Sequence, residues 1–297
     1  MAKPHRISSE LPAFAHTAAA PEANPAAVTL LTEDGFPLAG TRWLADGTAR
    51  GVALIAPAAG VPHRFYVPFA EHLVRSGLDT LTWDGRGIGD SRHETSSRDP
   101  RLTMRAWGTE DLQAAIDWAT RRAPGGPIHF VGHSFGAPAL GLARNADRIS
   151  RAVFVGGQHG WYGHWPLAQR LRLGFQWYLG VPLFASILGR FPGSRLGLGE
   201  DLPQGVALEM AAWCRRPSYL GTWEGHARVA IPILALSFAD DVQAPRRAVE
   251  ALLREYRSAH VLHEPLPAEG LGHFGFFSEA HAEGHWHRIV RFLLRGH

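Results

Sequence analysis

A serine between two glycines is the strongest chemical signal in this sequence. Residues 132–136 (Gly-His-Ser-Phe-Gly) have the form G-x-S-x-G, follow an apolar run over 128–131 and precede a helix-compatible run over 137–144. A strand that turns sharply into a helix at this pattern exposes the serine hydroxyl as a nucleophile. The glycines on either side of Ser134 remove Cβ atoms that so tight a turn cannot hold. The same residues could also form a plain turn whose serine caps a helix.

A nucleophilic serine needs a base that takes its proton and a carboxylate that orients the base. The chain order Ser, then Asp, then His is one arrangement that supplies them. Asp241 follows an apolar run over 231–238, and His273 lies in a glycine-rich stretch. Asp240 is the rival acid, but Asp241 is preferred because it stands four residues before Pro245, where a helix is expected to restart. Either carboxylate could instead stabilise a turn or cap a helix.

Acyl transfer also needs two backbone N–H groups that hold the negative charge on the substrate oxygen. One is expected from Phe135, the residue after the candidate nucleophile. The other is expected from residues 57–60 (Pro-Ala-Ala-Gly), which follow a predicted buried strand. We prefer Ala59 by position, although these small residues would also suit an ordinary turn.

Predicted strands and helices alternate through most of the chain. A hairpin around Asp34-Gly35 comes first, and Thr109 is placed as the N-cap of the second helix. The alternation predicts an α/β fold with a mostly parallel sheet and helices on both faces. The hairpin strands are expected over 28–32 and 36–43, the later strands over 51–56, 78–83, 128–131, 151–155, 231–238 and 261–265, and the helices over 65–76, 110–122, 245–256 and 282–294.

Three regions follow from this pattern. Residues 1–27 are rich in Ala, Pro, His and Ser and predict a disordered tail. Residues 28–157 and 231–297 form the predicted core, and 158–230, which lack clear strand signals, form a predicted helical cap. We expect an aromatic cluster at the start of the cap to lie beside the catalytic loops and to line an apolar acyl pocket: His159, Trp161, Tyr162, His164 and Trp165.

Composition excludes several classes of function. The 297 residues are 45% hydrophobic and 19% charged with a net charge of +3, and no basic run suggests nucleic-acid binding. Lys3 is the only lysine, which argues against Schiff-base chemistry and a P-loop. Cys214 is the only cysteine, which excludes an internal disulfide and fits a cytoplasmic location. The most apolar stretch, 173–188, is expected to be cut by Gly174, Gly180 and Pro182. It is also shorter than the ~20 residues of a membrane span, so no span is expected.

Two histidines on the last predicted helix need separate consideration. His281 and His285 are four residues apart and share a helix face, as a pair of metal ligands would. The glutamate between them is not adjacent to the first histidine as in H-E-x-x-H, and no third ligand is evident. The sequence therefore predicts neither a metal nor another cofactor, with His273 as the base.

From about residue 28 to its end, the sequence resembles the α/β-hydrolase superfamily. Residues 84–91 (Asp-Gly-Arg-Gly-Ile-Gly-Asp-Ser) are similar to the D-x-R-G-x-G-x-S loop common after the fourth strand of that fold. Residues 56–61, 237–241 and 272–277 look most like a bacterial group of predicted hydrolases near the serine aminopeptidase and monoacylglycerol lipase branch. The resemblance implies an eight-stranded sheet with a cap insertion. One departure is that Pro57-Ala58 stands where the superfamily usually has His-Gly in its oxyanion loop.

The resemblance implies a catalytic triad of Ser134, Asp241 and His273. The leading hypothesis is a serine hydrolase that cleaves a carboxylic ester or a related small acyl substrate. An acyltransferase or a peptidase would use the same triad, because an acyl-enzyme can be resolved by water, an alcohol or an amine. A ligand-binding protein that kept the fold and lost its activity is the alternative from another class.

Overall fold

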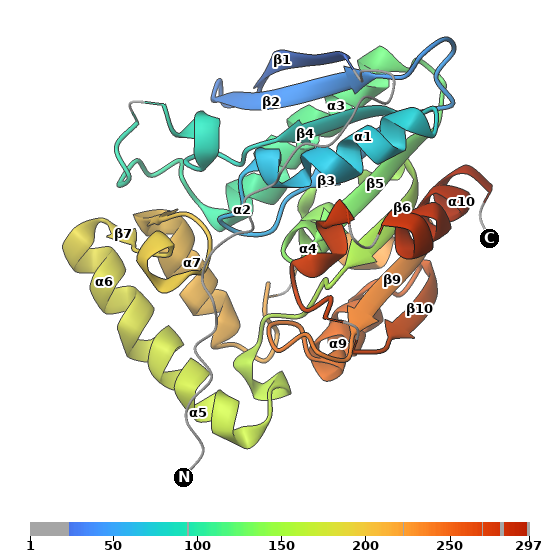
Figure 1. The fold of residues 1–297 in the computed structure, drawn as a ribbon. Coiled ribbons are helices and arrows are strands. Elements are labelled where there is room, and N and C mark those ends of the chain that lie inside the picture. The colour runs from blue at the N-terminus through green and yellow to red at the C-terminus, as the bar shows by residue number, and fades with distance from the viewer. Residues whose placement is uncertain (1–23, 94, 222, 269, 280–281, 296–297) are drawn as a thin grey trace.

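The computed structural model describes residues 24–93, 95–221, 223–268, 270–279 and 282–295 (Figure 1). Its central feature is one eight-stranded sheet in the order β1-β2-β4-β3-β5-β6-β9-β10. The six strands from β4 to β10 in that order are parallel, and β1 and β2 add an antiparallel hairpin at one edge. The bounds are β1 Asn24–Leu31, β2 Pro37–Leu44, β3 Val52–Ala56, β4 Asp79–Trp83, β5 Ile128–His133, β6 Ile149–Val155, β9 Pro232–Phe238 and β10 His260–Leu266.

Helices cover both faces of the sheet. Helices α1 (Val67–Arg75) and α10 (His287–Arg295) pack on one face, and α3 (Leu112–Arg122) and α9 (Arg246–Glu255) pack on the other. Strands β3, β4 and β5 are therefore buried along their whole length, which explains the continuous apolar run of β3. The predicted mostly parallel sheet with helices on both faces is confirmed.

The N-terminal boundary differs from the prediction. Strand β1 begins at Asn24, so the expected disordered tail is wrong for residues 24–27. These residues continue the antiparallel pairing of the hairpin, in which Asn24 lies opposite Leu44. Backbone hydrogen bonds to β2 hold them in place although most are exposed, so apolar patterning gave no signal. The rest of the expected tail, residues 1–23, lies outside the described residues.

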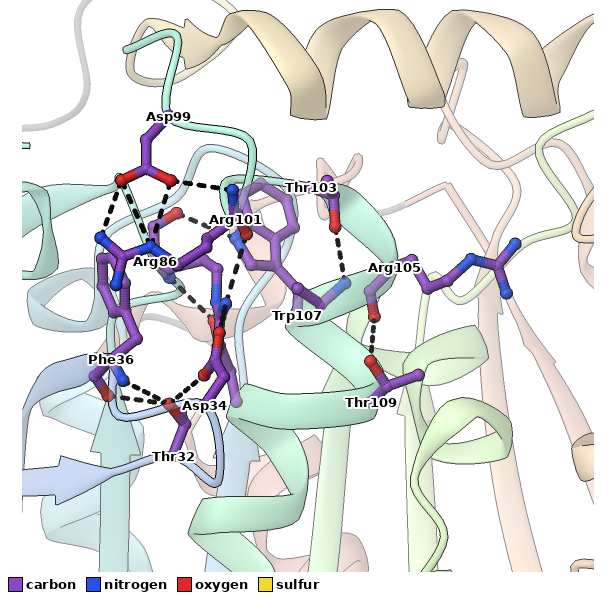
Figure 2. Close-up of polar contacts among 12 residues, drawn as sticks. Thr32, Asp34, Phe36, Arg86, Asp99, Arg101, Thr103, Arg105, Trp107 and Thr109 are labelled. Carbon is purple, nitrogen blue, oxygen red and sulfur yellow. Dashed lines mark hydrogen bonds and ion pairs between the residues drawn. The ribbon is translucent and has the colours of Figure 1, made fainter. Parts of the chain in front are cut away.

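The helical segment before α3 also begins earlier than expected. It runs through α2 (Met104–Ala106) and a π turn (Trp107–Asp111) into α3. Thr103 is its N-cap, because Thr103 Oγ1 accepts the N–H of Ala106 at 3.1 Å, whereas Thr109 lies inside the helix and donates to the carbonyl of Arg105 (Figure 2). The prediction of Thr109 as the N-cap is wrong. Gly108 weakened the helix signal, yet it is needed where the helix approaches Leu142 closely.

A buried ion-pair network holds the loop after β4. The backbone N–H and Nε of Arg86 donate to Asp111 at 2.8 and 2.7 Å, and its two terminal nitrogens donate to Asp34 at 2.7 and 3.0 Å (Figure 2). Hydrogen bonds from Arg86 lower the pKa of Asp34 to about 2. Asp34 is partly exposed, whereas Arg86 and Asp111 are both buried, and removing one partner of a buried pair typically costs about 3–5 kcal/mol. The network joins the β1–β2 hairpin and the α2–α3 segment to the loop that borders the oxyanion loop.

The segment between β6 and β9 carries the helices of the predicted cap. These two strands are neighbours in the sheet, so the insertion leaves and rejoins the sheet at one place. It contains α5 (Leu167–Phe175), a π turn (Gln176–Gly180), α6 (Val181–Leu188), the short strand pair β7 (Arg190–Phe191) and β8 (Leu202–Pro203), α7 (Gln204–Cys214) and α8 (Gly225–Arg228). Figure 1 shows α5 and α6 as one long rod on the outer side of α7.

The expected break in the apolar stretch 173–188 is absent. Residues 167–188 form one continuous helix, and among the described residues it is the one helix whose length and composition would suffice to cross a membrane. Gly174, Gly180 and Pro182 do not interrupt it. A proline ring clashes with the carbonyl four residues earlier in a regular α-helix. The π turn immediately before Val181 changes the helix geometry where that clash would arise, which reconciles Pro182 with a continuous helix.

Candidate active site

Ser134 lies in a strained turn between β5 and α4 (Gly136–Ala139). Its φ is 51°, a left-handed conformation that non-glycine residues rarely adopt. A Cβ on Gly132 would lie 2.7 Å from the backbone of the following helix, and a Cβ on Gly136 would lie 2.4 Å from the carbonyl oxygen of Ala56. Both glycines are thus sterically required. The turn has the geometry of a nucleophile elbow, with Ser134 at its apex and 8% exposed.

A histidine and an aspartate from two other loops pair beside the sheet. His273 Nδ1 lies 2.7 Å from Asp241 Oδ2, and both residues are buried. The other oxygen, Asp241 Oδ1, accepts the backbone N–H groups of Gln243 and Ala244, each at 2.8 Å. These contacts fix the carboxylate and leave its second oxygen for the imidazole. The structure thus pairs His273 with Asp241 and shows no such contact for Asp240 among the described residues.

His133, the residue before Ser134, connects two loops of the site. Its Nε2 lies 2.9 Å from the carbonyl oxygen of His273 and must donate to it, because a carbonyl only accepts. In the neutral ring Nδ1 then accepts, and the hydroxyl of Tyr66 donates to it at 2.8 Å. That hydroxyl in turn accepts the N–H of Ala58 at 2.9 Å. Burial and the neighbouring His273 lower the pKa of His133 well below its usual value, which keeps the ring neutral as this chain of bonds requires.

The hydrogen bond from Ala58 to Tyr66 limits which N–H groups of the loop 57–60 can serve as oxyanion donors. Pro57 has no N–H, and the N–H of Ala58 is donated to Tyr66. Ala59 supplies the next N–H of the loop, and its N–H and that of Phe135 donate to no protein acceptor within the described ranges. The cap fixes the far side of this loop, because the Glu200 N–H donates to the carbonyl of Gly60 at 2.7 Å. The geometry is thus compatible with Phe135 and Ala59 as the two donors.

The chain was compared with protein families, with curated proteins and with solved structures. A family model described as the α/β hydrolase fold matches residues 58–185. The chain has the α/β-hydrolase fold. A search of curated proteins found no match.

Solved structures with the α/β-hydrolase fold resemble the chain over most of its length at low sequence identity. One is a soluble variant of monoglyceride lipase from Saccharomyces cerevisiae bound to a substrate analog (TM-score 0.65, 16% identity, 93% of this chain and 98% of that chain). Another is a thermostable carboxyl esterase from Bacillus coagulans (TM-score 0.62, 14% identity, 91% and 97%). A third is a hypothetical protein from Pseudomonas aeruginosa (TM-score 0.64, 17% identity, 92% and 94%).

Gln158 is a site residue that the sequence did not reveal. It follows β6, and its side-chain oxygen and nitrogen both lie 3.4 Å from Ser134 Oγ. Among the described residues, the Gln158 side chain is the hydrogen-bond partner of the Ser134 hydroxyl. In enzyme structures without substrate, catalytic hydrogen bonds are often long and tighten only when substrate binds. Gly156, just before it, has a φ of 57°, and a Cβ there would lie 3.2 Å from Asp241 and 3.4 Å from His273.

The predicted substrate-binding cluster lies at the base of the cap. Trp165 donates its indole N–H to the carbonyl of Val242, next to the candidate acid, at 3.0 Å. His159 is buried, and its Nδ1 lies 3.2 Å from His164 Nε2. Trp161 and Tyr162 are half-buried. The role of this cluster as an acyl pocket stays a prediction.

A small apolar cavity lies beside the oxyanion loop. Phe135 and Trp107 line it together with the oxyanion loop, and none of the five cluster residues does. Its other lining residues are Ala56, Pro57, Ala58, Gly60, Val61, Trp83, Gly85, Ile88, Leu112, Gly136 and Ala139.

The possible metal ligands that the structure brings together differ from the two histidines considered in the sequence. His281 lies outside the described residues, so the structure does not test its pairing with His285. His63, Asp84 and Asp90 bring possible ligand atoms within 4.8 Å of one another. The carboxylate of Asp84, however, already accepts the backbone N–H groups of His63 and Asp90 at 2.6 and 2.8 Å, and His63 Nδ1 lies 2.9 Å from it. These contacts give Asp84 a structural role in shaping the loop after β4.

Proposed function

We propose that this chain is a serine hydrolase that cleaves a carboxylic ester or a related acyl compound through an acyl-enzyme on Ser134. The observation that carries the proposal is the strained elbow that presents Ser134, with the His273–Asp241 pair held on adjacent loops. The likeness of the fold to a carboxyl esterase and a monoglyceride lipase supports the same class of reaction. We also propose that the chain lies near the serine aminopeptidase and monoacylglycerol lipase branch of this fold.

In this mechanism His273 takes the proton from Ser134 Oγ as the oxygen attacks the substrate carbonyl. Asp241 holds His273 with Nδ1 protonated, so that Nε2 is free to accept, and it stabilises the imidazolium that forms. The N–H groups of Phe135 and Ala59 hold the oxyanion. His273 then gives its proton to the leaving alcohol. Water, activated by the same histidine, attacks the acyl-enzyme and restores the serine.

Turnover of short p-nitrophenyl esters tests the proposal. Replacement Ser134→Ala should lower kcat by a factor on the order of 10⁶, because the other triad members cannot act without the nucleophile. Ser186→Ala, on the exposed cap helix, is the matched control and should keep full activity. Activity of Ser134→Ala above a hundredth of the wild-type value would contradict the assignment. Addition of alcohols as acceptors then distinguishes hydrolysis from acyl transfer.

A further inference from the structure

The continuous helix 167–188 exposes a broad apolar ridge. Six large apolar residues follow one another at intervals of four, and three more widen the ridge. Their exposed fractions run from 45% to 71%, which is unusual for so many neighbours on one element. The six are Leu167, Leu171, Phe175, Leu179, Leu183 and Ile187, and the three are Tyr178, Phe184 and Leu188.

The opposite side of this helix is fixed to the protein. Val181 and Ala185 are fully buried in the same apolar cluster as Val206 and Ala207 of α7. At the helix end, Arg98 donates to the carbonyls of residues 186 and 187, each at 3.2 Å. At the other end, Trp165, two residues before the helix, donates to the carbonyl of Val242, so both ends of the helix are joined to the same protein body. A helix held in this way lies along a surface and does not cross a bilayer.

The charged side chains within the segment that carries the ridge are all of one sign. Residues 158–199 contain no aspartate or glutamate and four arginines. Arg172, within the helix, and Arg195, after it, are exposed, and the described residues give neither an acidic partner. Apolar side chains bordered by arginines match the interface of a bilayer that contains anionic lipid. In a two-fold dimer formed through this ridge, the same arginine-bearing borders would face each other, so the charges favour lipid over a second copy.

We propose that the ridge 167–188 is a docking surface for anionic phospholipid membranes, on which the helix lies parallel to the bilayer. The cap then faces the lipid. Trp165, two residues before the helix, donates to the carbonyl of Val242 beside Asp241, so docking would bring the entrance of the catalytic loops close to the membrane. The surface acts independently of any catalytic step.

Vesicle flotation of the full chain tests this proposal. A Ser134→Ala background removes turnover, so the result does not depend on the proposed function. The protein should float with vesicles of equal parts phosphatidylcholine and phosphatidylglycerol and bind pure phosphatidylcholine more weakly. The triple variant Leu171→Gln, Phe175→Gln, Leu179→Gln should bind at least ~10-fold more weakly, because full burial of one such side chain is worth that factor. Arg172→Gln with Arg195→Gln should lose about fivefold per arginine on anionic vesicles.

Matched controls and a second measurement decide the outcome. Leu31→Gln and Leu262→Gln remove exposed leucines from β1 and β10, the two edge strands of the sheet, and should leave flotation unchanged. Absence of wild-type binding to anionic vesicles, or equal losses in the controls, would overturn the proposal. Analytical ultracentrifugation tests whether a second copy of the chain binds the ridge instead of lipid. A concentration-dependent dimer that the triple variant abolishes, without vesicle binding, would assign the ridge to a second copy of the chain.

Discussion

At the residue scale, Ser134 depends on bonds made by its neighbour His133. Tyr66 and His133 join the oxyanion loop to the loop of His273 through three consecutive hydrogen bonds. Tyr66→Phe removes the middle of this chain without changing the ring that packs beside it. We expect kcat on p-nitrophenyl esters to fall about tenfold with little change in KM, because a loosened oxyanion donor acts mainly on the transition state.

Tyr256→Phe is the matched control for this prediction. Its buried hydroxyl donates to the carbonyl of Ala137 at 2.6 Å, outside the oxyanion loop. Tyr256→Phe should lose about 1 kcal/mol of unfolding free energy for one lost hydrogen bond, and Tyr66→Phe about 2 kcal/mol for two. Steady-state kinetics separate them, and an equal fall in kcat in the two would mean that Tyr66 acts only through stability.

The two neighbouring aspartates offer a second test at this scale. Asp241→Asn should lower kcat by about 10⁴, because an amide cannot hold His273 in the tautomer that accepts the serine proton. Asp240→Asn should cost far less, since the structure pairs His273 with Asp241. Side-by-side kinetics of the two variants decide the matter, and the reverse ranking would place the triad one residue away.

The candidate triad could be predicted from the sequence because each of its members has a local sequence signal. Ser134 stands between two glycines, and Asp241 and His273 each follow a predicted strand in the expected order. Gln158 and His133 gave no such signal. Their roles come from contacts with residues 24 to 140 positions away in the chain, which only the folded sheet brings together.

At the scale of single elements, the start of the α2–α3 segment is testable. Thr103→Ala should lower the free energy of unfolding by about 1 kcal/mol, because Thr103 satisfies an otherwise unpaired N–H at the helix start. Thr109→Ala removes only a bond from a side chain to the preceding turn and should change stability by less than half as much. Denaturant unfolding of both variants measures this, and a larger loss for Thr109→Ala would contradict the observed boundary.

The elements that were predicted well are those whose burial repeats along the chain. Strands β3, β5, β6 and β9 carry apolar runs because both of their faces are covered. The helix boundaries were predicted wrongly where local backbone geometry or close packing outweighs the helix propensity of single residues. Pro182 and Gly180 read as breaks, but a π turn accommodates them, and Gly108 weakened a helix that needs a small residue there.

At the scale of the whole molecule, buried neutral histidines make stability depend on pH. Burial lowers the pKa of His129, His159 and His226 to about 4, and that of His133 well below its usual value. The unfolded chain takes up these protons near pH 6.5 and the folded chain does not. Stability is therefore full above pH 6.5 and falls as the pH drops towards 4. Each such histidine contributes a slope of roughly 1.4 kcal/mol per pH unit.

His129→Leu provides the internal control for this prediction. His129 is 1% exposed and its Nδ1 has no hydrogen-bond partner among the described residues. The variant should be as stable as the wild type at pH 7 and should lose stability less steeply between pH 6.5 and 4. Urea unfolding at pH 7, 6 and 5 measures both slopes, and identical slopes would show that His129 is protonated in the folded chain.

The arrangement of the whole molecule was predictable only in part. Alternating strands and helices indicated the parallel sheet, and the gap in that alternation indicated the cap. How the cap lies on the sheet depends on single contacts such as the Glu200 N–H with Gly60 and the Trp165 indole with Val242. These contacts join distant parts of the chain and leave no pattern in the sequence.

The most direct test of the account is covalent labelling of Ser134 by a fluorophosphonate, read by mass spectrometry of the intact protein and of its peptides. A nucleophile activated by His273 attacks the phosphorus, displaces fluoride and forms one stable phosphonate ester. The account predicts a single modification on the peptide that contains Ser134, abolished by Ser134→Ala and strongly slowed by Asp241→Asn. An unmodified protein, or the same adduct on another residue in the Ser134→Ala variant, would contradict it.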